Sequence, residues 1–105
     1  MRVFKNTWFQ RFARREEITD QVLIVAIDRA EKGMVDADLG GKVIKQRIAR
    51  LKQGKSSGYR TIIIFNSGDK AFFVYGFTKS ERGNIDKGEI DIFKKAARYF
   101  DSNPK

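Results

Sequence analysis

The clearest structural signal in the chain is the stretch YRTIIIFNSGDKAFFVYGF, which runs from Tyr59 to Phe77. β-Branched and aromatic residues dominate both of its halves, as is typical of strands, and turn-forming residues lie between them. We therefore predict strands over residues 59–65 and 70–77 that pair as an antiparallel hairpin. Because both strands are apolar on both faces, we expect the hairpin to lie at the centre of a sheet and to be covered on both sides.

Upstream of this hairpin, the sequence predicts a further strand of the same sheet. Residues 43–50 read VIKQRIAR, and the alternation of side chains along a strand places Lys45 and Arg47 on one face. We predict a loop over residues 34–42 and a flexible basic connection over residues 51–58.

The N-terminal part predicts a short strand followed by two helices. The strand covers residues 2–6, and a capping box that starts at Thr7 precedes a helix over residues 8–16. Thr19 is the predicted N-cap of the second helix. Residues 22–27 are rich in β-branched side chains and could also form a buried strand, but the length of the segment and its caps favour a helix.

The C-terminal part predicts a third helix. Asp86 is the expected N-cap and Glu89 stands at position N3, which together make a second capping box. The predicted order is therefore βααβββα. We expect an α+β fold with a mainly antiparallel sheet and the helices gathered at one side, in one domain over residues 1–105.

The charge of the chain is strongly positive. Its 105 residues include 22 Lys and Arg against 13 Asp and Glu, for a net charge of +9. Such a basic domain favours a polyanionic partner, most often nucleic acid. The chain has no cysteine and no histidine, which excludes thiolate nucleophiles and Ser-His-Asp catalysis. Proton transfer must therefore use Lys, Arg, Tyr, Asp or Glu.

The common phosphate-binding and metal-binding motifs are absent from the sequence, so we expect no metal and no other cofactor. Asp36 and Asp38 are two positions apart, but we interpret them as solvated loop acids. The apolar stretches are far shorter than the roughly 20 residues of a membrane-spanning helix. We expect no membrane association and a cytoplasmic protein.

Five basic residues could converge at the strand ends. Lys45 and Arg47 share a face, and Arg60 is expected to open the next strand. Lys79 and Arg82 follow the third strand. A phosphate placed among them would receive charge-assisted hydrogen bonds. Each residue alone is more simply a solvated or edge charge, but a cluster of like charges calls for a compensating partner.

RNA cleavage is a reaction that suits such a cluster. The 2′-hydroxyl of RNA can attack the adjacent phosphate and leave a cyclic phosphate. Arginine and lysine side chains stabilise the negative charge that develops on phosphorus. A lysine among other cations has a lowered pKa, so it can also move a proton.

The segments GKSSGYRTIIIF and DKAFFVYGFTKSERGNID resemble the RelE family of toxins from bacterial toxin–antitoxin pairs. They are most similar to its small basic branch, in which a GYR strand is followed by an FxxYxFxKxER segment. The preceding DLGGKVIKQRIAR fits the second strand of that family. The resemblance implies the RelE/ParE-like fold.

The resemblance also implies a function. Family members cleave mRNA in the ribosomal A site without metal, by the 2′-hydroxyl route, and so block translation. Arg60 would contact the scissile phosphate, and the other catalytic candidates are Lys45, Arg47, Lys79 and Arg82. The RNA-binding candidates are Lys42, Arg50, Lys52, Lys55 and Tyr59. The implied partners are the ribosome with its mRNA and a cognate antitoxin that carries a helix-turn-helix region.

Two positions depart from the family pattern. Relatives carry an arginine at the position of Ser80. They also carry a tyrosine that stacks on the substrate base, at a position that falls near Asp86 in this chain. Tyr59 and Tyr75 are candidate substitutes, although both fit a core equally well. Two alternatives therefore stay open: a non-catalytic gyrase poison of the ParE type, and a plain RNA-binding module, which would expose aromatics for stacking. The retained cations favour the endonuclease.

Overall fold

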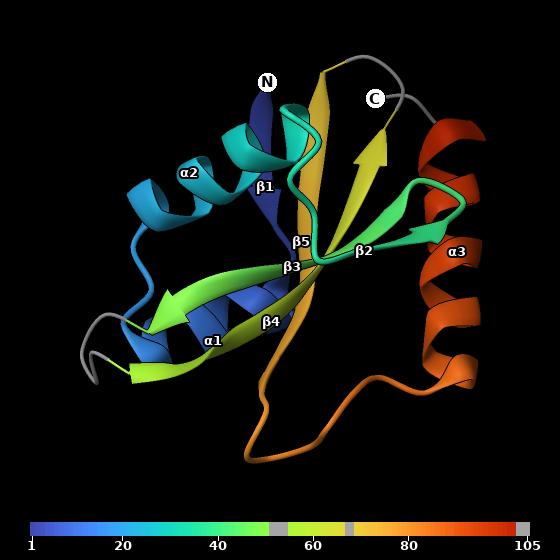
Figure 1. Cartoon of the computed structure of the whole chain (residues 1–105). Coiled ribbons are helices and arrows are strands. Elements are labelled where there is room, and N and C mark those ends of the chain that lie inside the picture. Colours follow the sequence, from blue (N-terminus) through green and yellow to red (C-terminus); the bar gives the residue numbers. More distant parts are fainter. Residues whose placement is uncertain (51–54, 67–68, 103–105) are drawn as a thin grey trace.

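The computed structural model describes residues 1–50, 55–66 and 69–102, which form a sheet with helices on both faces (Figure 1). The elements in chain order are β1 (Arg2–Lys5), α1 (Thr7–Glu16), α2 (Asp20–Glu31), β2 (Ala37–Gly40), β3 (Val43–Arg50), β4 (Lys55–Asn66), β5 (Lys70–Thr78) and α3 (Lys87–Ser102). The predicted α+β class is confirmed. The order differs from the predicted βααβββα by one short additional strand, β2.

The sheet has five strands in the described residues, in the order β1-β5-β4-β3-β2. β1 runs parallel to β5, and all other neighbours are antiparallel. The predicted hairpin is the β4–β5 pair, in which Tyr59 stands opposite Thr78 and Ile64 opposite Phe72. As predicted, it occupies the middle of the sheet.

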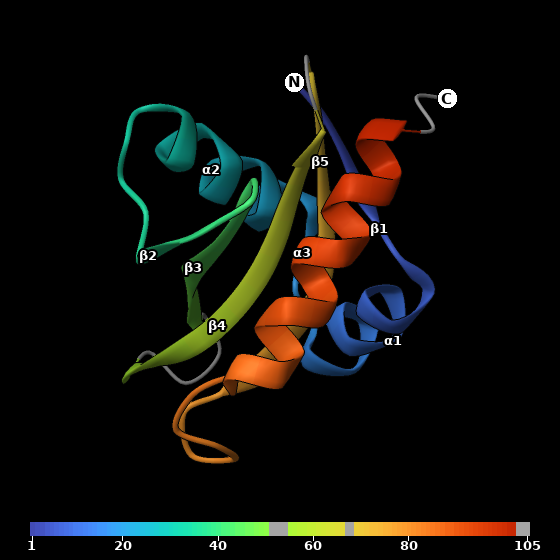
Figure 2. The ribbon, with the colours of Figure 1, turned by 90° about the vertical axis from the view of Figure 1, so that its right-hand side faces the viewer.

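The two faces of the sheet carry separate apolar cores. On one face, α1 and α2 pack on the strands, with Phe9 and Phe73 fully buried. On the other face, α3 covers a second core that contains Ile62 and Ala97; Figure 2 shows α3 crossing in front of the strands. The expectation that the helices gather at one side was therefore wrong. A hairpin that is apolar on both faces needs a cover on each.

The two N-terminal helices begin at capping side chains. Asn6 caps α1, since its Oδ1 accepts a hydrogen bond from the backbone N–H of Phe9 at 2.8 Å. The capping box predicted from Thr7 was wrong by one residue. Thr19 caps α2 as predicted and accepts from the N–H of Val22 at 3.3 Å. The segment after Thr19 is therefore a helix, and the buried-strand alternative is excluded.

The start of α3 carries the predicted capping box. Asp86 Oδ1 accepts from the N–H of Glu89 at 2.9 Å, and Glu89 Oε1 accepts from the N–H of Asp86 at 3.1 Å. This box fixes the point at which the chain leaves the β5–α3 segment and enters the helix. None of the described helices, α3 included, is long and apolar enough to cross a membrane.

Two stretches that were predicted as loops contribute strands. Ala37–Gly40 pairs with β3 as strand β2, after which Gly40, Gly41 and Lys42 turn the chain with φ values of 86°, 59° and 68°. The second stretch supplies the start of β4, which begins at Lys55. The prediction that Arg60 opens its strand was therefore wrong, because Arg60 lies within β4.

Candidate functional site

The candidate site lies on the face of the sheet that α3 partly covers. Arg47 on β3 stands directly opposite Arg60 on β4, and Arg60 stands opposite Phe77 on β5. Phe77 belongs to the core beneath α3. Directly paired residues share a face of a sheet, and so do residues two apart on one strand. Lys45, Arg47 and Arg60 therefore all lie on this face.

Lys45 and Arg60 converge on a single carboxylate oxygen. Lys45 Nζ lies 3.7 Å and Arg60 Nε lies 3.4 Å from Oδ2 of Asp36. Both basic side chains are only 18% exposed, and the Asp36 side chain is 32% exposed. The interpretation of Asp36 as a solvated loop acid was wrong. Both separations exceed the roughly 2.7–2.9 Å of a direct charge-assisted hydrogen bond, so these ion pairs are loose.

The closest approach of Asp36 to Arg60 is at the Nε atom, at 3.4 Å. Within the part of the chain that the structure describes, the Arg60 side chain makes no hydrogen bond, and Asp36 is its ion-pair partner. A guanidinium group binds phosphate bidentately through two parallel N–H bonds. Asp36 thus lies beside Arg60 without a hydrogen bond to it, and no described residue engages the N–H donors of its side chain in a hydrogen bond.

A buried glutamine sets the position of Asp36. Gln46 is 3% exposed, and its Oε1 accepts from the backbone N–H of Asp36 at 3.2 Å. Its amide nitrogen donates to the carbonyls of Ala26 and Met34 at 2.9 and 3.0 Å. Gln46 thereby ties the segment before β2 to both α2 and β3. The place of Asp36 follows from this backbone contact as well as from its ion pairs.

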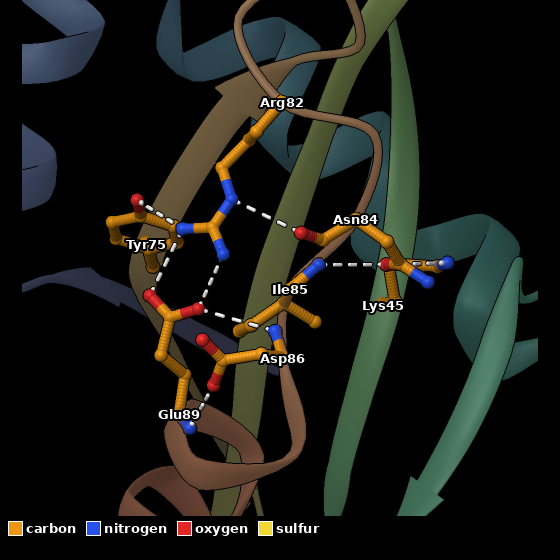
Figure 3. Close-up of polar contacts among 7 residues, drawn as sticks. All are labelled: Lys45, Tyr75, Arg82, Asn84, Ile85, Asp86 and Glu89. Carbon is orange, nitrogen blue, oxygen red and sulfur yellow. Dashed lines mark hydrogen bonds and ion pairs between the residues drawn. The ribbon is translucent and has the colours of Figure 1, made fainter.

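Arg82 lies in the β5–α3 segment and is held by a second carboxylate (Figure 3). Its Nη1 donates to Glu89 Oε2 at 2.9 Å and to the Tyr75 hydroxyl at 3.1 Å. Its Nη2 donates to Glu89 Oε1, and its Nε donates to the carbonyl of Asn84 at 3.0 Å. The guanidinium also lies 5.9 and 5.6 Å from the ring centroids of Tyr75 and Phe77, within cation–π range.

These contacts use most of the hydrogen-bonding capacity of Arg82. An arginine has five N–H donors, and here one at Nε, two at Nη1 and one at Nη2 are engaged, which makes four. The hydrogen bonds with Glu89 and then Tyr75 raise the pKa of Arg82. The hydrogen bonds that Glu89 accepts from Arg82 and from the N–H of Asp86 lower the pKa of the Glu89 carboxyl. Arg82 therefore acts as a clamp on the β5–α3 segment.

Asn84 connects that segment to Lys45. Its Oδ1 accepts from Lys45 Nζ at 3.3 Å and from the N–H of Ile85 at 2.8 Å (Figure 3). The ammonium group of Lys45 thus contacts Asn84 as well as Asp36. Sequence reasoning missed Asp36, Asn84 and Glu89 as site residues. The capping box signalled the place of Glu89, but no local pattern indicates the contacts of the other two, which join segments distant in the chain.

A comparison with known protein families identifies the family of the chain. Residues 1–104 match the family described as the RelE toxin of the RelE/RelB toxin–antitoxin system. The chain belongs to the RelE toxin family. The match confirms the resemblance found in the GYR and K-x-E-R segments, and it makes the protein a toxin with a cognate antitoxin as partner. No curated protein matches the chain.

The remaining cations of this RelE-family toxin are spread more widely. Lys79 is exposed just after β5 and makes no ion pair with any described residue. Lys42 is exposed in the β2–β3 turn, at the opposite end of β3 from Arg50. The side chains of Arg50 and Lys55 lie outside the described part of the structure, and so does the whole of Lys52.

Both tyrosines proposed as base-stacking substitutes pack against other residues of the RelE-family toxin. Tyr59 is 3% exposed in the core beneath α1 and α2, where its hydroxyl donates to Glu16 Oε1 at 2.8 Å. Its RNA-binding assignment is therefore corrected to a core role. The hydroxyl of Tyr75 accepts from Arg82, and its ring lies against the guanidinium. Asp86, near the position of the family tyrosine, caps α3.

Proposed function

We propose that this RelE-family toxin is a metal-independent endoribonuclease that cleaves mRNA in the A site of the translating ribosome and so blocks translation. The observation that carries the proposal is the convergence of Lys45 and Arg60 on one oxygen of Asp36, at 3.7 and 3.4 Å. Two cations that meet at one anionic oxygen can also meet at an oxygen of a phosphate. The terminal nitrogens of Arg60 would grip that phosphate bidentately.

The reaction that fits this pair is an internal displacement at phosphorus. The 2′-hydroxyl of one nucleotide attacks the adjacent phosphorus, a 2′,3′-cyclic phosphate forms, and the 5′-oxygen of the next nucleotide leaves. Negative charge grows on the non-bridging oxygens, where Arg60 and Lys45 stabilise it electrostatically. Arg47 is exposed opposite Arg60 and Lys79 is exposed beyond β5, and we assign both to neighbouring phosphates.

The same proposal includes partners and a place of action. The net charge of +9 complements ribosomal RNA and an acidic segment of the antitoxin. We expect the antitoxin to carry a helix-turn-helix region and to keep the toxin off the ribosome while the two are bound. The proposed place of action is the cytoplasm.

The test is a cleavage assay with purified toxin, translating ribosomes and a defined mRNA. The wild-type protein is expected to cut within the A-site codon, and only when ribosomes are present. Arg60→Ala is expected to lower the rate at least about 100-fold, because it removes a preorganised donor to the transition state. Arg98→Ala is the matched control, since Arg98 is exposed on α3 and its loss changes the net charge equally.

Three outcomes would contradict the proposal. Full growth inhibition by Arg60→Ala would remove Arg60 from the site. Inhibition of DNA gyrase by the wild-type toxin without any cut in mRNA would indicate a ParE-type poison. Tight RNA binding without cleavage would indicate a plain RNA-binding module.

A further inference from the structure

We propose that Asp36 is a further catalytic residue, the acceptor of the 2′-hydroxyl proton, and that Lys45 donates a proton to the leaving 5′-oxygen. This inference rests on the endonuclease function proposed above and assigns the two proton transfers that it requires. Asp36 was not among the predicted catalytic residues, and the family match does not assign it a role.

Few groups near the cations can take a proton. The chain has no histidine, and arginine stays protonated in proteins. Glu89 is engaged by Arg82 at both oxygens, and its Oε1 also accepts a hydrogen bond from the backbone N–H of Asp86. Among the described carboxylates, Asp36 is the one that contacts both Lys45 and Arg60. The candidate acceptor therefore lies where the phosphate is proposed to bind.

The loose geometry of Asp36 suits a catalytic group more than a structural ion pair. Its contacts of 3.4 and 3.7 Å are long beside the 2.9 Å hydrogen bond from Arg82 Nη1 to Glu89 Oε2. Catalytic hydrogen bonds are often long before substrate binds and shorten in the complex. With 32% of its side chain exposed, Asp36 is open to a hydroxyl group of bound RNA.

An in-line displacement needs one group at the attacking oxygen and another at the leaving oxygen. These two oxygens lie on opposite sides of phosphorus. Asp36 Oδ2 and Lys45 Nζ are 3.7 Å apart. One group can thus serve the attacking oxygen while the other serves the leaving oxygen. Asn84 Oδ1, 3.3 Å from Lys45 Nζ, holds the ammonium group in place.

The proton balance of the step closes within the site. As the O2′–P bond forms, the 2′-hydroxyl proton passes to the Asp36 carboxylate. As the P–O5′ bond breaks, its electron pair stays on O5′, which takes a proton from the Lys45 ammonium group. Asp36 is then a neutral acid and Lys45 a neutral amine. Return of the proton from Asp36 to Lys45 across their 3.7 Å separation restores both charges.

The central experiment is Asp36→Asn in single-turnover cleavage on ribosomes. The amide keeps the size of the side chain and an oxygen acceptor for Arg60, but it does not take up a proton at neutral pH. We expect the rate to fall about 10²–10⁴-fold, while the affinity for the ribosome stays at the wild-type value.

Two further variants separate a chemical role from a structural one. Asp36→Glu retains a carboxylate and should recover part of the rate. Asp91→Asn removes the same charge from an exposed position on α3 and should cleave at the wild-type rate. Thermal unfolding of all three variants checks that a lost rate is not a lost fold.

A modified substrate tests the two assignments independently. When sulfur replaces the 5′-oxygen of the scissile linkage, the leaving group departs without needing a proton. The defect of Lys45→Ala should then shrink at least tenfold relative to its defect on ordinary RNA, whereas that of Asp36→Asn should persist. Equal defects on both substrates for Lys45→Ala would overturn the donor assignment.

The outcomes distinguish this inference from the function on which it rests. If the wild type cuts mRNA and Asp36→Asn cuts it as fast or faster, Asp36 is only a competitor for the phosphate, and the inference fails while the function stands. If the wild type cuts no mRNA on ribosomes, the function itself fails. A folded Asp36→Asn that has lost both ribosome binding and cleavage would make Asp36 a binding residue, which also overturns the inference.

Discussion

Replacing Gly76 with alanine should destabilise the sheet beneath the site. Gly76 is buried on β5, between the two residues whose rings lie next to Arg82. A Cβ atom at this position would stand 2.6 Å from Cε2 and 3.0 Å from Cζ of Phe12. Favourable carbon–carbon contacts lie at about 3.5–4.0 Å, so either the ring or the strand must shift by nearly 1 Å.

The surroundings of Phe12 set the size of the effect. Its ring is 2% exposed, and its centroid lies 5.3, 5.5 and 5.6 Å from those of Trp8, Phe9 and Tyr59. Overpacking of such a core costs about 1–3 kcal/mol, and the reduced freedom of the unfolded chain offsets about 0.4–1 kcal/mol of this. We expect a net loss of about 1–2 kcal/mol, with Tm lowered by about 4–8 °C for each kcal/mol.

Denaturant and thermal unfolding measure this loss, and two comparisons make it specific. Gly83→Ala is the control, since an added Cβ there meets nothing within 4 Å, and we expect unchanged or slightly raised stability. In a Phe12→Leu background, the cost of Gly76→Ala should fall, with a coupling energy of about 0.5–3 kcal/mol. A Gly76→Ala protein as stable as the wild type, or an equal cost in both backgrounds, would refute the clash.

Three further predictions concern charge and hydrogen bonding. Hydrogen bonds in the fold lower the pKa of the Glu89 carboxyl below its ordinary value of 4.5. The ionised carboxylate therefore stabilises the protein above that pH, and this stabilisation is lost as the pH falls through the lower pKa of the folded state. The difference in Tm between the wild type and Glu89→Gln should accordingly be constant near neutral pH and become smaller in acid. Lys79→Gln should reduce the slope of log affinity for single-stranded RNA against log salt by about 0.7, measured by titration at several salt concentrations. Tyr59→Phe loses the 2.8 Å hydrogen bond to Glu16, so unfolding should become easier by about 0.5–1.5 kcal/mol while the cleavage rate stays at the wild-type value.

The elements that local sequence specifies were predictable. The hairpin over residues 59–77, the Thr19 cap and the box at the start of α3 each depend on residues a few positions apart. β2 was not predictable in this way, because Ala37–Gly40 has little strand propensity and becomes a strand by pairing with β3. Its existence depends on a neighbour that the local pattern does not contain.

The cap of α1 shows the same limit at the scale of one residue. Asn6 and Thr7 are both good N-cap residues, so local sequence does not choose between them. In the fold, the side-chain nitrogen of Asn6 also donates to the carbonyl of Val74 on β5 at 3.1 Å. This contact across the structure ties Asn6 to β5, which selects the earlier cap.

The alternation of side chains along the strands predicted one part of the site. Alternation placed Lys45 and Arg47 on one face, and a sheet neighbour could be expected to add Arg60. The capping box predicted where Glu89 stands in α3, but the contacts of Glu89 and Asp36 with the cations were not predictable, because they join separate segments of the chain. Gln46 binds the segment that carries Asp36, and the α3 capping box positions Glu89.

The carboxylates of Glu89 and Asp36 contact the predicted cations in two different ways. Glu89 forms two hydrogen bonds with Arg82, which leaves Arg82 little capacity to bind an RNA phosphate. Asp36 lies 3.4 Å from Arg60 and forms no hydrogen bond with it, so the donors of Arg60 are not engaged by a described residue. A module that only binds RNA gains affinity from each uncompensated cation. A carboxylate held between Lys45 and Arg60 by a buried glutamine works against such binding, because it lowers the positive potential where the phosphate would lie. The same carboxylate favours cleavage if it accepts a proton, and this difference favours an enzyme over a binding module.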